Sequence, residues 1–318
     1  MNQLKRILKM HPARVLKKLC CFEEIYTIAY RKREGKSMMD ADHLSFQAVP
    51  YHNDYWYADP ILVTAHDTDY LFAECFDMRT QKGIIGCAKF DGHGNLSDFV
   101  PVIEESYHLS FPMVFEWAGK WYMIPESSDN RSINLYCCQG DMLCWQKIRE
   151  FPTQNPLVDT VVLSCNEDTV ELLSSAIHSE DPLQYQWQKL ILRKTGDDFA
   201  LEEAGLVDGC EAYTRWNRMA GKIADVNGKV ILPTQESTQT DYGINLYLND
   251  FSDKDLRKLT GKKLTVNDLT IGGIALKEMI GIHSYAVSEQ YEVVDIRYFR
   301  FSPQNRWRKI VQKLGRKS

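Results

Sequence analysis

Residues 58–74 (ADPILVTAHDTDYLFAE) decide the fold: an apolar strand that opens on a polar residue is followed by a tight polar turn and a second apolar and aromatic strand. Residues 110–126 (SFPMVFEWAGKWYMIPE) repeat this pattern. When the two copies are aligned on their proline residues, Glu74 and Glu126 also coincide, although neither belongs to the hydrophobic pattern. A repeat of about 50 residues built from short strands is typical of a β-propeller blade.

Three weaker copies follow, at residues 158–173, 219–235 and 283–295. Together the copies predict an all-β fold, a single closed five-bladed β-propeller, which has no exposed sheet edges to invite aggregation. The alternative is a β-sandwich or solenoid whose hairpins resemble one another by chance. The coincidence of Glu74 with Glu126 favours the propeller.

The composition limits the class of protein. The chain has 318 residues, 44% of them hydrophobic, which is enough to bury a large core. It contains no run of about 18 apolar residues that could span a membrane, and no secretory signal precedes the first copy. The nine cysteines include two adjacent pairs and no C-x-x-C spacing. We therefore expect reduced thiols, a cytoplasmic location, and neither a metal site nor a cofactor.

The net charge of −5 hides a strong asymmetry along the chain. Residues 1–19 and residues 303–318 each carry six Lys or Arg and no acid, which leaves −17 for the body between them. Apolar residues recur at helical spacing in both ends. This pattern predicts a basic amphipathic helix at residues 1–21, the propeller at residues 22–302 and a second basic helix at residues 303–318.

Basic amphipathic helices lie well on anionic membranes, where each Lys or Arg near the surface adds about 1 kcal/mol. We therefore expect peripheral contact with the inner face of the membrane. The alternative is a pair of helices packed on the propeller with solvated basic faces. The acidic body repels phosphate, so nucleic acid is not an expected partner.

Polar residues at the starts of the first strands are the main candidates for a functional site. In a propeller these strands line a central channel, and ligands bind where the channel opens. The residues in question are Asp59, Ser110, Asp159 and His283. Glu74 and Glu126, at the ends of second strands, are expected to return to the same face. Carboxylates crowded in a partly dehydrated space push their pKa values apart, which gives one site both an acid and a base. For Asp59 the alternative is a side chain that caps its own turn before a proline.

Two further clusters carry groups that bind anions and sugars. His108 stands just before the second copy, either as a titratable neighbour of the channel or as a buried histidine that holds a backbone group. Arginines beside aromatic residues can bind phosphate or carboxylate, while the aromatic ring stacks on a sugar or base. The alternative is a cation–π pair on the surface. Around the fourth copy these residues, with two hydrogen-bonding neighbours, are Arg215, Trp216, Arg218, Gln235 and Tyr242.

Common catalytic motifs are absent from the sequence. There is no Gly-rich phosphate loop, no nucleophilic serine elbow and no metal-ligand spacing. Kinases, esterases and zinc hydrolases are therefore not expected classes.

The order of several motifs resembles one known family. The motifs are residues 24–31, 56–60, 108–112, 124–127, 242–243, 281–283 and 291–295. Over roughly residues 22–300 they resemble the propeller module at the N-terminus of plant glucosamine inositolphosphorylceramide transferases, which also occurs as stand-alone bacterial proteins. That module is similar in architecture to the five-bladed glycoside hydrolases of family 43, whose acidic triad lies in the channel. The resemblance implies a carbohydrate-active propeller of glycan or glycolipid assembly.

The resemblance carries over unevenly from residue to residue. It implies that Asp59 matches the general base of those hydrolases and that Asp159 matches their pKa-modulating aspartate. The fourth copy has no general-acid glutamate at the expected place and offers Gln235 and Glu236 instead. Because hydrolysis needs a matched acid and base, this departure disfavours simple glycoside hydrolysis.

Three functions remain open at this point. The favoured one is a glycosyltransferase-type enzyme that uses a sugar nucleotide or a lipid-linked acceptor, with Asp59 or Glu126 as base and with Arg215, Arg218 and His108 holding diphosphate. The others are a family-43-like hydrolase, with Glu126 or Glu236 as acid, and a non-catalytic glycan-binding module. The expected catalytic residues are Asp59, Glu126 and Asp159, and the expected binding residues are Glu74, His108, Ser110, Arg215, Trp216, Arg218, Gln235, Tyr242, His283 and Asp295.

Overall fold

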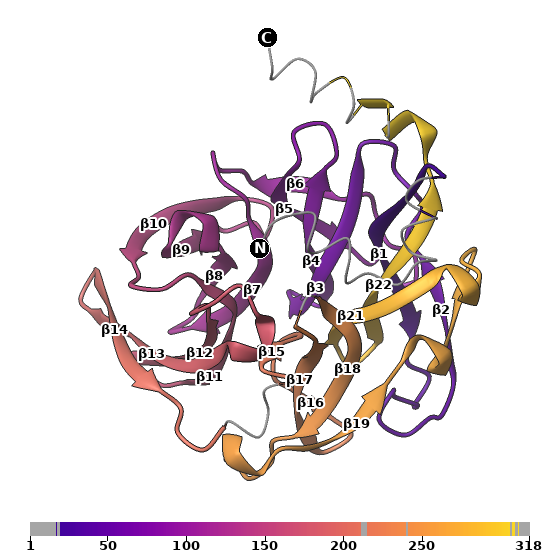
Figure 1. Ribbon diagram of the computed structural model, residues 1–318. Helices are drawn as coiled ribbons and strands as arrows, with labels where there is room; N and C mark the ends of the chain where they lie inside the picture. The colour runs from indigo at the N-terminus through magenta and orange to yellow at the C-terminus, as the bar shows by residue number, and fades with distance from the viewer. Residues whose placement is uncertain are drawn as a thin grey trace.

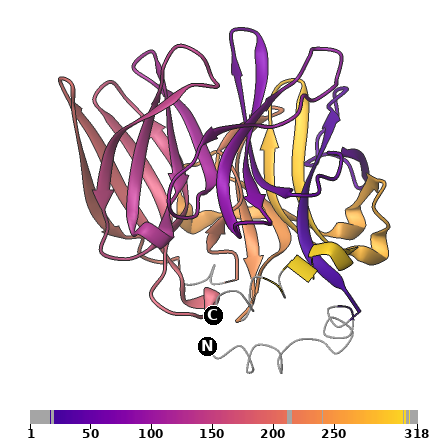
Figure 2. The same ribbon diagram turned by 90° about the horizontal axis from the view of Figure 1, so that it is seen from above.

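The computed structural model describes residues 17, 20–210, 215–239, 241–305, 307–308 and 311. Its strands form five sheets of four or five strands each, which follow one another as blades around a ring (Figure 1). After a turn of 90°, strands of neighbouring blades stand side by side (Figure 2). The predicted five-bladed propeller is confirmed, and the sandwich and solenoid alternatives are wrong.

Blades I to IV follow the order of the sequence. Blade I consists of β3 (Tyr55–Ala65), β4 (Thr68–Asp77), β5 (Lys82–Lys89) and β6 (Val100–Ile103). Blade II consists of β7 (Ser110–Trp117), β8 (Lys120–Glu126), β9 (Ser132–Cys138) and β10 (Trp145–Pro152). Blade III consists of β11 (Leu157–Cys165), β12 (Thr169–Ala176), β13 (Gln186–Thr195) and β14 (Asp198–Leu206). Blade IV consists of β15 (Arg218–Met219), β16 (Ala224–Val226), β17 (Lys229–Ser237), β18 (Tyr242–Asp250) and β19 (Thr260–Leu264). Short 3₁₀ helices in the connections are η1 (Ser128–Asn130), η2 (Pro182–Gln184), η4 (Leu256–Lys258), η5 (Val266–Asp268) and η6 (Leu276–Glu278).

Blade V joins strands from opposite ends of the sequence. It consists of β21 (Met279–Val287), β22 (Tyr291–Phe301), β1 (Phe22–Lys32), β2 (Leu44–Ala48) and β20 (Leu269–Gly272). β1 pairs with β22 along its whole length, from Phe22 opposite Phe301 to Lys32 opposite Tyr291. Figure 1 shows the result as indigo and yellow strands in one blade. The pairing of β1 with β22 thus closes the ring.

The first strand of each blade is the innermost. β3, β7, β11 and β15 contact one another in turn, and β21 contacts β3. Aromatic residues pack between the sheets further out: Phe90 stacks on Tyr291 at 3.8 Å between blades I and V, and Phe72 meets Trp145 edge-on at 5.7 Å between blades I and II. Because burial of such apolar surface is the main force that favours folding, these contacts hold the blades together.

Most of the two predicted terminal helices lies outside the described residues, so both helices stay predictions. Residues 303–305 are helical. Within the described part of the chain, no helix has the length and apolar character needed to cross a lipid bilayer.

Candidate functional site

Four of the inner strands are interrupted at the same place. In blade I the pairing with the second strand slips between Ala58 and Ile61, and equivalent slips occur in blades II, III and V. The residues inside these bulges are Asp59 and Pro60, Phe111 and Pro112, Asp159 and Thr160, and His283 and Ser284. Asp59 and Asp159 have a φ of 52°, and Phe111 has 41°. Such backbone costs a non-glycine residue about 1–3 kcal/mol, and bulges of this kind re-aim side chains beside functional sites.

Asp59, His283 and Asp295 form a buried, ion-paired triad between blades I and V. His283 Nδ1 lies 2.9 Å from Asp295 Oδ2 and 3.2 Å from Asp59 Oδ1. Asp295 also accepts the backbone N–H groups of Asp59 at 2.9 Å, His283 at 3.1 Å and Ser284 at 2.7 Å. The Ser284 hydroxyl in turn donates to Asp59 Oδ1 at 3.1 Å. The triad therefore ties the first blade to the last.

The carboxylates determine the charge of the triad. Burial opposes a charge on His283, yet Asp295 and Asp59 together raise its pKa well above 6.5, so the imidazole is protonated at neutral pH. Burial also opposes a charge on Asp59, but the charge and hydrogen bond of His283 outweigh it and lower the pKa of this carboxyl. His283 Nδ1 faces the carboxylates, whereas its Nε2 is buried without a hydrogen-bond partner among the described residues.

The triad also has the spacing of a metal site, because its ligand atoms lie within 4.8 Å of one another. However, the oxygens of Asp295 already accept three backbone N–H groups and the imidazole. The imidazole nitrogen that faces them carries a proton, and a metal ligand needs a free lone pair. The geometry thus fits an internal ion-pair network better than a cation site.

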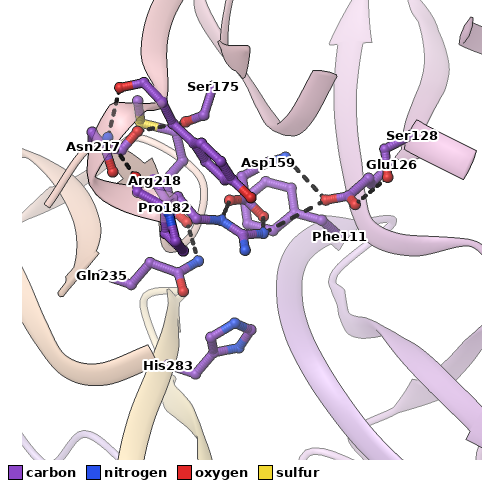
Figure 3. A network of polar contacts seen from close by, with 12 residues as sticks. Phe111, Glu126, Ser128, Asp159, Ser175, Pro182, Asn217, Arg218, Gln235 and His283 are labelled. Carbon is purple, nitrogen blue, oxygen red and sulfur yellow. Dashed lines mark hydrogen bonds and ion pairs between the residues drawn. The ribbon is translucent and has the colours of Figure 1, made fainter. Parts of the chain in front are cut away.

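A second ion pair joins blades III and IV. Arg218 donates from Nε and Nη2 to the two oxygens of Asp159 at 2.5 and 2.9 Å, and both side chains are almost fully buried. The guanidinium also lies 4.0 Å from the centre of the Tyr242 ring and 3.9 Å from Glu126 Oε2. Figure 3 shows this pair in the middle of the polar network. Asp159 thus balances the charge of Arg218 and accepts from two of the five N–H donors of its guanidinium.

Glu126 is a carboxyl that titrates near neutral pH. Its Oε1 accepts a hydrogen bond from Ser128 Oγ at 2.9 Å, and its Oε2 accepts the Asp159 N–H at 3.2 Å. Burial and the charge of Asp159 raise the pKa of Glu126 to about 8, against the opposing charge of Arg218. Glu126 therefore holds a proton at neutral pH and releases it just above.

Raising the pH from 5 to 9 is expected to lower the free energy of unfolding. An unfolded Glu126 titrates near its ordinary value of 4.5 and the folded one at about 8, so between these values the folded chain binds a proton that the unfolded chain has released. Stability is therefore lost as the pH rises through this window, by roughly 3–5 kcal/mol for this group.

Urea unfolding across the pH range tests this dependence of the free energy of unfolding on pH. Glu126→Gln should flatten the dependence and Glu289→Gln, an exposed control, should not. A Glu126→Gln profile that matches the wild type would contradict the assignment.

Glu74 and His108 form a neutral pair beside the triad. Glu74 Oε1 lies 3.3 Å from His108 Nε2, and His108 Nδ1 accepts the Gly83 N–H at 2.9 Å. Burial, reinforced by Asp59, raises the pKa of Glu74 well above 4.5, and burial lowers the pKa of His108. A Cβ on Gly83 would lie 2.8 Å from both Glu74 Oε1 and His108 Cε1. A glycine there makes room for a buried carboxylic acid behind a half-exposed imidazole.

Neighbouring residues of β17 face opposite sides. The Nε2 of fully buried Gln235 donates to Met219 O at 2.8 Å, and its Oε1 has no partner within the described residues. Glu236 faces the other way, as strand alternation requires, and pairs with Lys263 Nζ at 2.9 Å on β19. Glu236 is therefore not placed to act as the general acid of a hydrolase.

Most of the predicted residues meet at one place. Ser110 is buried opposite Glu126 in the sheet. Arg215 is exposed, and its charge contributes to lowering the pKa of Glu236. The Trp216 ring packs on Tyr247 at 4.8 Å. The residues whose side chains meet, which we call the central cluster, are Asp59, Glu74, Glu126, Asp159, Arg218, Gln235, His283 and Asp295.

Aromatic residues that sequence analysis did not single out border the central cluster. The Tyr26 ring lies 5.2 Å from His283 and 5.3 Å from Trp56, and Trp56 stacks on Phe76 at 4.4 Å. On the other side Tyr242, which was predicted, lies 5.6 Å from His283. The pairing of β1 with β22 brings Tyr26 to this place. These strands lie at opposite ends of the sequence, so the order of the strands does not predict their pairing.

Part of the chain matches a known family. Residues 44–195, from the start of β2 to the end of β13, match the family described as glucosamine inositolphosphorylceramide transferase 1, N-terminal. The glucosamine inositolphosphorylceramide transferase 1 of Arabidopsis thaliana is 38% identical over 107 residues, which cover 33% of this chain and 14% of that protein. Its namesake from Oryza sativa subsp. indica is 33% identical over 104 residues, 32% of this chain and 14% of that protein. The chain thus matches only about a seventh of the length of these relatives.

Solved structures with a similar fold include two glycoside hydrolases. The catalytic domain of a Coprinopsis cinerea GH62 α-L-arabinofuranosidase has a TM-score of 0.48 and 11% identity, covering 77% of this chain and 92% of that one. A GH43 β-1,3-galactosidase with galactodeoxynojirimycin has a TM-score of 0.44 and 13% identity, covering 68% and 79%. The predicted resemblance is confirmed within narrower bounds than expected: by its residues 44–195 this five-bladed propeller matches the N-terminal module of the glucosamine inositolphosphorylceramide transferase 1 family.

Proposed function

We propose that this protein binds a carbohydrate at the central cluster and takes part in the assembly of a cell-surface glycan or glycolipid. One observation carries the proposal. Two buried atoms of the central cluster, Gln235 Oε1 and His283 Nε2, have no hydrogen-bond partner within the described residues. An unsatisfied buried polar atom costs about 1–3 kcal/mol, which the hydroxyl groups of a ligand would recover.

The chemistry of these atoms suits a sugar. Gln235 Oε1 can only accept a hydrogen bond and the protonated His283 Nε2 can only donate one, whereas a hydroxyl does both. The half-buried rings of Tyr26 and Trp56 offer apolar faces to the C–H face of a sugar ring. The family match of residues 44–195 supports a role in glycolipid chemistry.

For the reaction we favour glycosyl transfer, with Glu126 as the base that takes the proton of the acceptor hydroxyl. A base works best when its pKa is close to the working pH, and the pKa of Glu126, about 8, meets this condition. Asp59 is the weaker base, because its pKa is lowered. Asp159 is neutralised by its arginine. Hydrolysis, which needs a second free carboxylate, and binding alone are the alternatives.

The basic ends of the chain support a further element of this proposal, contact with the cytoplasmic face of a membrane near a lipid-linked acceptor. Residues 1–19 and 303–318 each carry six positive charges, against −17 on the body between them. Anionic lipid attracts such segments, and salt weakens the attraction. Sedimentation with phosphatidylglycerol vesicles, but not with phosphatidylcholine vesicles, is the expected result. Equal sedimentation with both would overturn this element.

A thermal-shift screen tests the proposed function. The probes are glucose, galactose, mannose, xylose, arabinose and N-acetylglucosamine, together with UDP-glucose, UDP-galactose and UDP-N-acetylglucosamine. A nucleotide sugar that stabilises the protein more than its free sugar supports transfer. Stabilisation by free sugars alone supports the hydrolase or binding alternative against transfer. If no probe raises the melting temperature, the carbohydrate proposal is overturned.

Gln235→Met is expected to weaken the binding of the best probe at least about tenfold, because the buried acceptor is lost. Gln188→Met is the matched control. Gln188 is another buried glutamine, on β13, and its Nε2 donates to Glu203 at 2.6 Å. Each variant removes one hydrogen bond that the glutamine Nε2 donates, to Met219 O in Gln235→Met and to Glu203 in Gln188→Met. Isothermal titration should find the loss of affinity in Gln235→Met alone, and wild-type affinity in that variant would contradict the prediction.

A further inference from the structure

A large open pocket lies beside the central cluster. Its volume is about 740 Å³, and loops of blades II, III and IV line it. The lining residues used below are Arg131, Asn155, His178, Pro182, Tyr185 and Tyr242. A pocket of this size fits within the range of small-molecule sites, and sequence analysis identified only one of these residues, Tyr242.

Tyr242 belongs to both the pocket and the central cluster. Its ring lines the pocket, lies 4.0 Å from the Arg218 guanidinium and is 5.6 Å from the His283 ring. Tyr185 lines the same pocket, and burial raises its pKa. Tyr242 therefore links the pocket with the central cluster.

The wall of the pocket is fixed to the central cluster by one residue. The Asn217 carboxamide donates to Pro182 O at 3.0 Å and to Tyr185 O at 2.6 Å. The backbone carbonyl of Asn217 accepts hydrogen bonds from Ser175 Oγ and from Trp187 Nε1, at 2.5 and 2.7 Å. Figure 3 shows Asn217 beside Pro182 and Ser175. Since Asn217 directly precedes Arg218, its hydrogen bonds hold the loop that carries Tyr185 in place before any ligand binds.

The lining combines ring faces with groups that donate and accept hydrogen bonds. Tyr185 and Tyr242 contribute aromatic side chains to the lining, and Arg131, Asn155 and His178 contribute polar ones. A sugar ring has this double character, with C–H faces and a rim of hydroxyl groups. We propose that the pocket is a second subsite, which holds the next sugar ring of a glycan whose first ring lies in the central cluster. The proposal rests on the carbohydrate function proposed above.

The experiment compares a free sugar with its disaccharides. The probes are the free sugar that stabilises the protein most in the screen and its 1→3, 1→4 and 1→6 linked disaccharides, measured by isothermal titration. At least one disaccharide should bind about tenfold more tightly than the free sugar. Tyr185→Ala should reduce the ratio of these two affinities to near one, and Tyr185→Phe, which keeps the ring, should preserve the ratio.

The outcomes separate the two proposals. If no sugar of the panel binds, the carbohydrate function itself fails. If the free sugar binds and no disaccharide binds more tightly, or if Tyr185→Ala keeps the advantage of the disaccharide, the subsite proposal is overturned while the function stands.

Discussion

Replacing Arg218 with methionine is expected to lower the free energy of unfolding by about 3–5 kcal/mol. Methionine fills much of the space of the arginine stem, but it leaves the Asp159 carboxylate, 1% exposed, without its two donors and its counter-charge. The cost of this change is mainly the burial of an unpaired charge. Removing that charge as well, in the double variant Arg218→Met, Asp159→Leu, should therefore recover a large part of the loss.

Arg193→Met is the matched control for this prediction. Arg193 Nη2 lies 3.4 Å from Glu202 Oε2, with side chains that are 50% and 60% exposed. An exposed pair contributes at most about 1 kcal/mol, so this variant should be close to wild type. Urea unfolding of all three variants decides the matter. The ion pair does not hold blades III and IV together in the way described if Arg218→Met costs no more than Arg193→Met.

Replacing Gly221 with alanine is expected to cost roughly 3–5 kcal/mol, or to prevent folding altogether. Gly221 lies in the break between β15 and β16 with a φ of +151°, and a Cβ there would be 2.0 Å from the Tyr285 carbonyl oxygen. That carbonyl belongs to the backbone of β21, and the Tyr285 N–H donates to Ala220 O at 2.7 Å. The methyl group therefore has to push apart blades IV and V, beside Gln235 and His283.

Gly228→Ala separates the clash from the backbone strain. Gly228 also has a positive φ, +81°, but nothing lies within 4 Å of a Cβ at this position. This variant should lose only about 1 kcal/mol, the cost of the conformation alone. Urea unfolding measures both variants. Similar losses in the two would show that the close approach of Gly221 to Tyr285 has no energetic weight.

The sequence allowed the architecture to be predicted because each blade carries its own local signals. Two short strands and a tight turn recur at a fixed spacing, and the bulge keeps the same register in successive blades. Glu74 lies opposite Ala58, and Glu126 lies opposite Ser110, one residue before the bulge in each case. The coincidence of the two glutamates in the repeat thus reflected a real structural equivalence.

The partners of the site residues could not be predicted in the same way, because they come from distant parts of the chain. Arg218 was predicted to bind anions, and its ion pair with Asp159, 59 residues away on another blade, was not foreseen. Tyr26 was overlooked because only the closed ring brings it to His283. The positive φ of Asp59 is likewise set by a bulge between two strands, which no single residue encodes.

The pairing of β1 with β22 also determines when folding can be completed during synthesis. During synthesis β1 leaves the ribosome long before β22, so its full-length pairing has to wait until residues 291–301 have been made, although Ala29 and Tyr30 can already pair with β2. Contacts so far apart in sequence form slowly, because a long loop must be closed first. His283 and Asp295 lie on β21 and β22, the last strands to be made. The contacts of Asp59 with these two residues can therefore form only after both strands are present. Sugar binding should therefore begin only with the last step of folding, and a bound fluorescent sugar would time the closure of the ring in a refolding experiment.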